Sequence, residues 1–593
     1  MMAGVQYEQY YVALLGLAET FRTANPPNLR ASIQCLQAVF NFQLPPNLLA
    51  VAHFYFGRLM HQYTKQADLA RAHLERAFAM SNQQGFEEIR VQAASLLAEV
   101  YLEQRHVDSC KQTINQVLDL SSAFSFWRCR LLFQLAEASV CQRDFETAYR
   151  CLDVGAEYCS SMNVLYTESL FRLSKGMLLL VDRERLSSSI QDVHAILQRV
   201  SFAIQNMNVS ALRREYLKAF FLVLQVCHFL MVGQVKSSKP CLKQLQGSIQ
   251  LITSSQESDS AASHMPVEYF MWLSREDLCI FVYLVTVVHA MQAGQMERAQ
   301  KYTEKALSQM EKVRAQGRGS EELLLKMEVL LLEHSAQCRL VVGTPSLAIQ
   351  QISRLCQLSQ RAAKIFSAHE SQIHALLGLY AMCMRCPESA ERQFNTALRL
   401  AKDLDLWSFV NLNLAIVYLQ SGRDPDFYAI LERITPERLR TNCECLKAAS
   451  HYVRGLQSFF HNRYQEAKRY LKDSLAMSNN EDLSRCSTAA LVLLGHIFLR
   501  YQNIQECSNM LSPALELANR IPDLSFQIWA SSLLKDVYLL CNDTKKADEA
   551  KQVHDTYVLR LEKDMAKARD SQEHNLVNWV EGPFLFMSGS AAL

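Results

Sequence analysis

Residues 378–397 read GLYAMCMRCPESAERQFNTA and carry the spacing of a helical hairpin. Gly378 lies in an apolar segment, a turn follows at Cys386-Pro387, and a second small residue, Ala390, comes twelve positions after the glycine. Phe394 and Ala397 continue the apolar face of the second segment. Small residues at such positions let two antiparallel helices approach closely, while the large apolar residues join neighbouring hairpins.

The same spacing recurs along the chain, at Gly455 with Ala467 and Leu471, and at Gly495 with Cys507 and Leu511. Small or apolar anchors of first helices recur at Gly57, Ala98, Ala136, Gly176, Val226, Val287, Ala336, Gly378, Ala415, Gly455 and Gly495. Most gaps are about 37 to 50 residues, longer than the 34 of an ideal tetratricopeptide (TPR) repeat, so we expect longer helices and connections. The predicted fold is all-α, a right-handed superhelical solenoid of TPR-like hairpins. An armadillo or HEAT solenoid, or an irregular helical bundle, is the alternative, because spacing separates these classes imperfectly.

The turns inside the hairpins share a signature, in which a polar or glycine step precedes a large apolar residue and then a small one. Examples are residues 144–148 (DFETA), 294–299 (GQMERA) and 462–467 (NRYQEA). Glycine and asparagine tolerate the backbone that a helix stop requires, and acidic residues suit the N-terminus of the next helix. The turns therefore also predict a chain of TPR-like helical hairpins.

A solenoid also explains how 593 residues lack an obvious linker between folds. We expect a continuous superhelix over residues 1–574, with about 11–13 hairpins, and a C-terminal tail over residues 575–593. Low-complexity sequence predicts a mobile insertion at residues 253–266. Asp424-Pro425 is a second expected weak point.

Composition narrows the function. The net charge of +2 gives the whole chain no electrostatic reason to coat nucleic acid or an anionic membrane. No secretory signal or membrane span is expected, and the 18 cysteines lie in helical patterns typical of a reducing compartment. We find no phosphate-binding glycine loop, zinc-protease motif or nucleophile elbow, and Cys383 with Cys386 forms a lone pair. We therefore predict a non-enzymatic protein without cofactor or metal.

The first helices indicate what the protein binds, because they line the concave surface of a TPR array. The lysine–asparagine clamp of chaperone-binding TPRs is absent from the anchor positions. Residues 281–288 and 220–224 are instead apolar nearly all round, which predicts burial on every side. Two readings remain: a long segment of a partner chain fills the groove, or the superhelix packs on itself. Helical position selects a candidate partner-binding groove of Phe133, Phe281, Leu284, Val288, Met291, Leu379, Tyr452, Phe459 and Phe460.

Several stretches also carry a family resemblance that runs in order from about residue 11 to residue 583. They include residues 35–40 (CLQAVF), 129–136 (CRLLFQLA), 173–180 (LSKGMLLL), 283–287 (YLVTV), 452–456 (YVRGL) and 573–577 (EHNLV). Together they resemble the Mau-2 homolog family, the smaller TPR subunit of the cohesin loading complex.

The resemblance implies a partner and a role. Members of that family wrap the N-terminal segment of the large HEAT-repeat loader subunit of the Nipped-B-like type, and the pair loads cohesin onto chromatin for sister-chromatid cohesion. It thus implies a nuclear, chromatin-associated scaffold with indirect contact to cohesin and little direct nucleic-acid binding. The alternatives are a general TPR adaptor in another multi-subunit complex and a DNA-binding helical protein, which would bind duplex in a salt-dependent manner.

Overall fold

The computed structural model of the protein describes residues 2–64, 66–82, 84–182, 186–254, 270, 272–317, 320–361, 363–439 and 441–581. Within these ranges the chain is helical and contains no strand. Its contacts divide it into two compact units. Unit 1 comprises residues 1–217 and 255–272, and unit 2 comprises residues 218–254 and 273–593.

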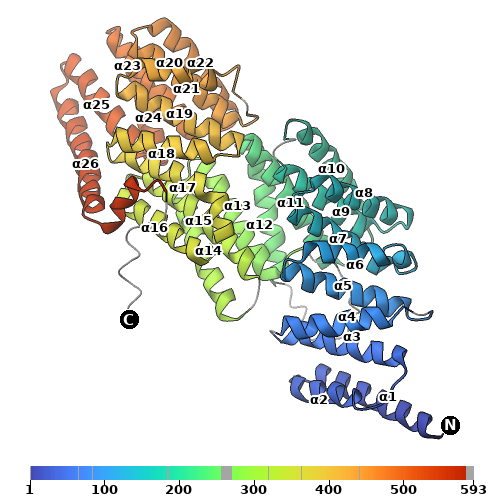
Figure 1. Ribbon diagram of the computed structural model, residues 1–593. Coiled ribbons are helices and arrows are strands. Elements are labelled where there is room, and N and C mark those ends of the chain that lie inside the picture. The colour runs from blue at the N-terminus through green and yellow to red at the C-terminus, as the bar shows by residue number, and fades with distance from the viewer. Residues whose placement is uncertain are drawn as a thin grey trace. The chain divides into compact units, whose positions relative to one another are not determined.

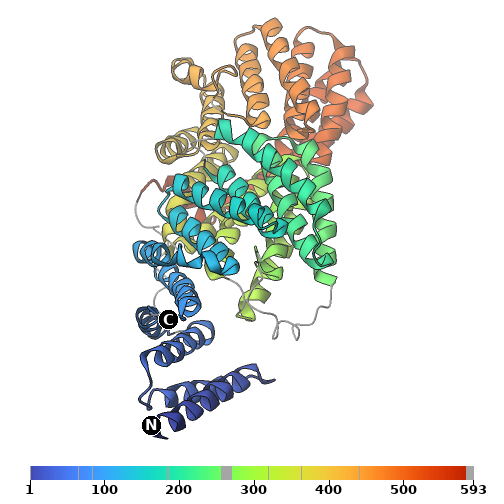
Figure 2. The same ribbon diagram turned by 90° about the vertical axis from the view of Figure 1, so that its right-hand side faces the viewer.

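Unit 1 is a series of antiparallel hairpins. Its helices are α1 (Met2–Thr23), α2 (Leu29–Val39), α3 (Pro46–Tyr63), α4 (Ala67–Met80), α5 (Glu87–Glu103), α6 (Val107–Val117), η1 (Leu120–Ala123), α7 (Ser125–Cys141), α8 (Phe145–Ser161), α9 (Leu165–Val181) and α10 (Leu186–Asn206). Each odd-numbered helix pairs with the next one, and the first helices α3, α5 and α7 also contact one another in succession. Figure 2 shows these hairpins following one another in chain order.

Unit 2 continues this arrangement with longer helices. α11 (Ala211–Val232) spans the division between the units, and the following helices are α12 (Val235–Ser254), α13 (Arg275–Gln292), α14 (Met296–Ala315), α15 (Glu321–Val341), α16 (Pro345–Arg361), α17 (Ala363–Cys383), α18 (Pro387–Leu400), α19 (Leu404–Gln420), α20 (Asp424–Ile434), α21 (Glu444–Phe460), α22 (Tyr464–Asn480), α23 (Ser484–Arg500), α24 (Ile504–Arg520), α25 (Leu524–Leu540), α26 (Thr544–Arg569) and η3 (Gln572–Asn578). Helices pair from α13–α14 to α25–α26, and the first helices from α13 to α25 contact each other in order. The predicted all-α fold of stacked TPR-like hairpins is confirmed.

A residue with positive φ stops the first helix of most hairpins. It is Arg143 after α7, Gly294 after α13 and Asn462 after α21. At the last of these, the N–H of Arg463 donates to the carbonyl of Ser458 at 2.8 Å, which satisfies a carbonyl at the end of the helix. The predicted turn signature therefore marks real helix stops, although arginine fills the left-handed position in several of them.

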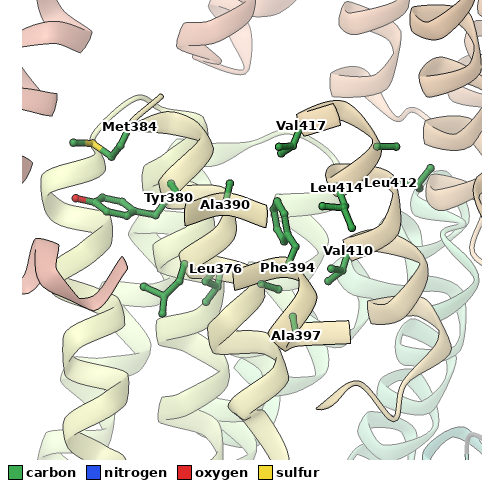
Figure 3. Close-up of a cluster of buried hydrophobic side chains, with 14 of the residues drawn as sticks. Leu376, Tyr380, Met384, Ala390, Phe394, Ala397, Val410, Leu412, Leu414 and Val417 are labelled. Atoms are coloured by element: carbon green, nitrogen blue, oxygen red, sulfur yellow. The ribbon is translucent and has the colours of Figure 1, made fainter. Parts of the chain in front are cut away.

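The anchors place the two helices of a hairpin in direct contact. All eleven predicted anchors are buried. A Cβ atom added to Gly378 would lie 2.4 Å from the ring of Phe394, so the ring occupies the space that glycine leaves open. Figure 3 shows this ring between the α17–α18 hairpin and Val410 and Leu414 of α19. The spacing predicted from residues 378–397 thus both closes the hairpin and attaches it to the next one.

The C-terminal part of unit 2 returns to the middle of that unit. The end of α26 and η3 pack against α16, and η3 also contacts α17 and α18 (Figure 1). The carboxylate of Asp564 on α26 accepts hydrogen bonds from the N–H of Ser346 at 3.0 Å and from its hydroxyl at 2.9 Å. It thereby caps the N-terminus of α16 from a distant part of the chain.

Three sequence expectations concern the connections. Residues 253 and 254 of the expected insertion end α12, and residues 255–266 lie outside the described residues, as do residues 582–593 of the expected tail. The tail's first residues are packed, with Leu576 and Val577 buried. Asp424-Pro425 is not a break, because it begins α20, where the first turn tolerates proline.

One described helix, α11, is long and apolar enough to cross a membrane by length and composition alone. Half of its most apolar window is buried among the protein's own residues. A core helix meets the same criterion, so this is weak evidence for a membrane span.

Candidate partner-binding groove

Phe133 of α7 lies in an aromatic stack within unit 1. Its ring is stacked on that of Phe171 from α9, with centroids 3.9 Å apart and planes 3° apart. Phe270, from the connection between α12 and α13, contacts Phe133 at 5.4 Å and is stacked on Phe126 at 4.9 Å. Helical spacing placed Phe133 on an inner face, but it did not reveal the ring of the same chain that covers it.

A polar network lies on the first helices of the same unit. The amide of Gln134 donates to the backbone carbonyl of Ser95 at 3.0 Å and to Glu99 at 3.3 Å, and Arg130 is paired with Glu99. The pKa of Glu99 is lowered, because its hydrogen bonds and ion pairs with His61 and Arg130 outweigh the raising effect of its burial. Next to the aromatic stack, unit 1 therefore presents charged groups that are already paired.

Four predicted groove residues share one helix, α13, in unit 2. Phe281, Leu284, Val288 and Met291 follow helical spacing and contact the cluster formed with α14 and α15. Leu284 is only 4% exposed, whereas the other three are half-buried. Leu284 therefore contributes to the core, and the other three offer the surface that a partner could touch.

The structure also addresses the apolar character of the first helices. In α13, every residue from Val282 to Val287 except Tyr283 is buried, and in α11 the residues from Leu222 to Leu224 are buried. Intramolecular packing thus covers most of these two segments. Packing against neighbouring helices therefore accounts for the apolar composition of these two segments without a partner.

A second predicted group lies on α21. Tyr452 and Phe459 are half-buried, and Phe460 is 49% exposed. Phe459 contacts His496 of α23 at 4.8 Å, and His496 contacts Trp529 of α25 at 6.1 Å. Rings from three successive first helices therefore form a continuous row, of which the sequence picks had included only the α21 members.

Leu379 lies on α17, half-buried against the large core cluster of unit 2. The same hairpin, α17–α18, also contacts the chain's own C-terminal segment. The indole of Trp579 is stacked on the buried His374 at 4.5 Å, and the side-chain amide of Gln393 donates to the backbone carbonyls of Val577 and Trp579. The side-chain amide of Gln393 thus binds backbone carbonyls of a distant segment of the same chain.

The cysteines and histidines do not gather into a metal site within the parts of the chain that the structure describes. Cys383 ends α17 and Cys386 precedes α18, so this pair lies at a hairpin turn as expected. Cys129 and Cys159 approach to 3.5 Å between sulfurs and are buried as thiols between α7 and α8. Burial raises the pKa of Cys227 and of Cys356 to about 12, which keeps these two thiols protonated and inert.

Stacked TPR-like hairpins, with half-buried aromatic residues on several of their first helices, define a helical-repeat protein. Comparison with known families identifies which one. Residues 10–545 match the sequence profile of the cohesin loading factor family. The chain belongs to this family.

Two relatives agree with that assignment, and a solved structure has a similar fold. The chain is 41% identical to the MAU2 chromatid cohesion factor homolog of Aedes aegypti over 579 residues, covering 96% of this chain and 92% of the relative. It is 41% identical to that of Drosophila melanogaster over 590 residues, covering 98% and 92%. Its fold is similar to that in a crystal structure of Scc4 in complex with Scc2n, with a TM-score of 0.59 and 12% identity over 94% of this chain and 99% of that chain.

Proposed function

We propose that this protein is the TPR subunit of a cohesin loader, and that it sheathes the N-terminal segment of the large HEAT-repeat, Nipped-B-like subunit. In this role it supports loading of cohesin onto chromatin for sister-chromatid cohesion. Its contact with cohesin and chromatin is made through the complex, in the nucleus. It acts by binding, and the chemistry of loading lies in other subunits.

The observation that carries the proposal is the match to the cohesin loading factor family over residues 10–545. The similar fold of Scc4, solved in complex with Scc2n, supports a partner segment held by the repeats. The charge balance of +2 supports binding to protein instead of a polyanion. A segment that orders on binding requires a large buried area, and a row of repeats several hundred residues long provides it.

The proposed groove consists of the half-buried and exposed candidates Phe133, Phe281, Val288, Met291, Leu379, Tyr452, Phe459 and Phe460. Leu284 belongs to it by position, but a charge there would disturb the core of α13. Because a long interface spreads its energy over many contacts, single alanine changes should alter binding little. Two charges on separate first helices should break it.

The groove is tested by coexpression of the tagged full chain with the N-terminal segment of the large subunit. Met291→Asp combined with Phe460→Asp should abolish copurification, because both side chains are accessible without being part of a fully buried core. Phe202→Asp is the matched control, since this phenylalanine is 71% exposed on the second helix α10. A folded double variant that still copurifies the segment at the wild-type ratio would refute the groove assignment.

The function itself is tested by a tagged pulldown from nuclear extract after nuclease treatment, with mass spectrometry of the copurifying proteins. The proposal requires near-stoichiometric recovery of a large HEAT-repeat subunit, with cohesin in smaller amounts. Recovery of ubiquitin-ligase subunits or other TPR clients without that partner would identify a general adaptor and overturn the proposal.

A further inference from the structure

An aromatic slot in unit 1 is formed by the first half of α7 and the first turn of α9. Phe126 and Phe133 are seven residues apart, and therefore share one face of α7. Tyr166 lies in the first turn of α9. Phe126, Phe133 and Tyr166 are all half-buried, and together they define the aromatic slot.

The slot holds one residue by two kinds of contact. The ring of Phe270 is stacked on Phe126 at 4.9 Å and tilted against Phe133 at 5.4 Å. The hydroxyl of Tyr166 donates to the backbone carbonyl of Phe270 at 3.3 Å. The slot therefore recognises an aromatic ring together with a backbone carbonyl. This chemistry suits an aromatic residue on an extended chain, with little dependence on the neighbouring sequence.

Phe270 is the outer layer of a three-ring stack. Phe171 at the inner side is fully buried, and Phe133 separates it from Phe270, which is itself half-buried. The ring contacts and one long hydrogen bond are worth far less than the burial of a core phenylalanine. The stack beneath Phe270 is thus retained by the core whether or not Phe270 is in place.

We propose that the aromatic slot is a binding site for an aromatic residue of the large subunit's N-terminal segment, and that Phe270 competes with that residue in the free protein. The inference rests on the proposed function, because it names a contact within the same groove. Phe133 connects the proposed groove with the aromatic slot, because it belongs to both. The seated phenylalanine shows the side-chain class that the slot accepts.

The test measures the dissociation constant of the fluorescently labelled N-terminal segment for the full chain. Phe270→Ala removes the competitor and should tighten binding by roughly 2- to 12-fold, the range expected for losing one aromatic stacking contact. Phe126→Ala in the Phe270→Ala background should reverse the gain. Phe202→Ala, at an exposed phenylalanine outside the slot, should change nothing.

An alanine scan of the aromatic residues of the segment completes the test. One of them should matter in the Phe270→Ala protein and lose its effect when Phe126 is also alanine, which is the coupling expected of a direct contact. Unchanged or weaker binding by a folded Phe270→Ala protein, with normal binding by the wild type, would overturn this inference alone. Failure of the wild type to bind the segment would instead overturn the proposed function.

Discussion

Replacing Trp579 by alanine should release the C-terminal segment from α16, α17 and α18 in unit 2. The indole is only 7% exposed, is stacked on His374 with planes 5° apart, and follows the buried Leu576 and Val577. Truncation of a buried tryptophan costs about 3–5 kcal/mol, including the lost stacking. Docking of η3 should weaken by that amount, which corresponds to a factor of about 10²–10³ or more in the opening equilibrium.

A second variant isolates the hydrogen bonds of the same site. The amide nitrogen of Gln393 donates to Val577 at 2.9 Å and to Trp579 at 2.6 Å, and its oxygen lies 2.7 Å from Nδ1 of His374. Because the amide nitrogen serves the two carbonyls, the oxygen must accept from His374, which places the proton of that imidazole on Nδ1. Gln393→Glu keeps the shape but turns the donor into an acceptor. It should therefore release the segment as well.

The assay is hydrogen exchange of the full chain, followed by mass spectrometry of peptides covering residues 564–581 and the first turn of α16. Both variants should exchange faster in these peptides, up to the limit set by global unfolding, while the α21–α24 hairpins keep their protection. Leu539→Ala, at a side chain that is 54% exposed on α25, is the control. Wild-type protection of residues 572–579 in Trp579→Ala would refute the reasoning, because it would mean that the indole contributes nothing to docking.

Three further outcomes are expected. Gly378→Ala should destabilise unit 2 by about 1–3 kcal/mol in urea unfolding, because the added methyl group meets a buried ring. The control Gly247→Ala should be neutral or stabilising, because this helical position has open space for a methyl group. Burial lowers the pKa of His289 to about 4. The contribution of this residue to the free energy of unfolding is therefore complete above pH 6.5, and up to roughly 3 kcal/mol of it is lost as the pH falls towards 4. His289→Leu should flatten that part of the pH–stability curve, and an unchanged curve would contradict the assignment to this residue. Asp564→Asn should weaken the cap of α16 by about 1 kcal/mol, and an unchanged exchange rate in the first turn of that helix would disprove the capping role.

The class of fold follows from short-range pattern, and the pattern is local for a physical reason. Gly378 and Phe394 are sixteen residues apart, so the small residue and the ring that fills its space meet whenever the hairpin closes. The turns carry their own signals, because a helix stop favours a residue that tolerates positive φ, such as Asn462. Family membership could likewise be inferred from ordered stretches of sequence, since the match extends over nearly the whole chain.

Candidate groove residues could be assigned to helices but not to environments. Periodicity placed Leu284 and Phe460 equally on first helices, yet one is buried and the other is half exposed. Leu284 lies in the middle of α13, in the cluster formed with α14 and α15, whereas Phe460 is the last residue of α21. Which neighbours cover a position is decided when the hairpins stack, and no local spacing encodes it.

What the amino-acid sequence determined is therefore the repeated hairpin, its turns and its family. Only the tertiary structure decided where two aromatic rings outside the repeats are seated, Phe270 on Phe126 in unit 1 and Trp579 on His374 in unit 2. Each of these rings binds residues more than 100 positions away in the chain, and neither belongs to a repeat. Such contacts form only after the repeats have stacked, because the stacking creates the surfaces that receive them.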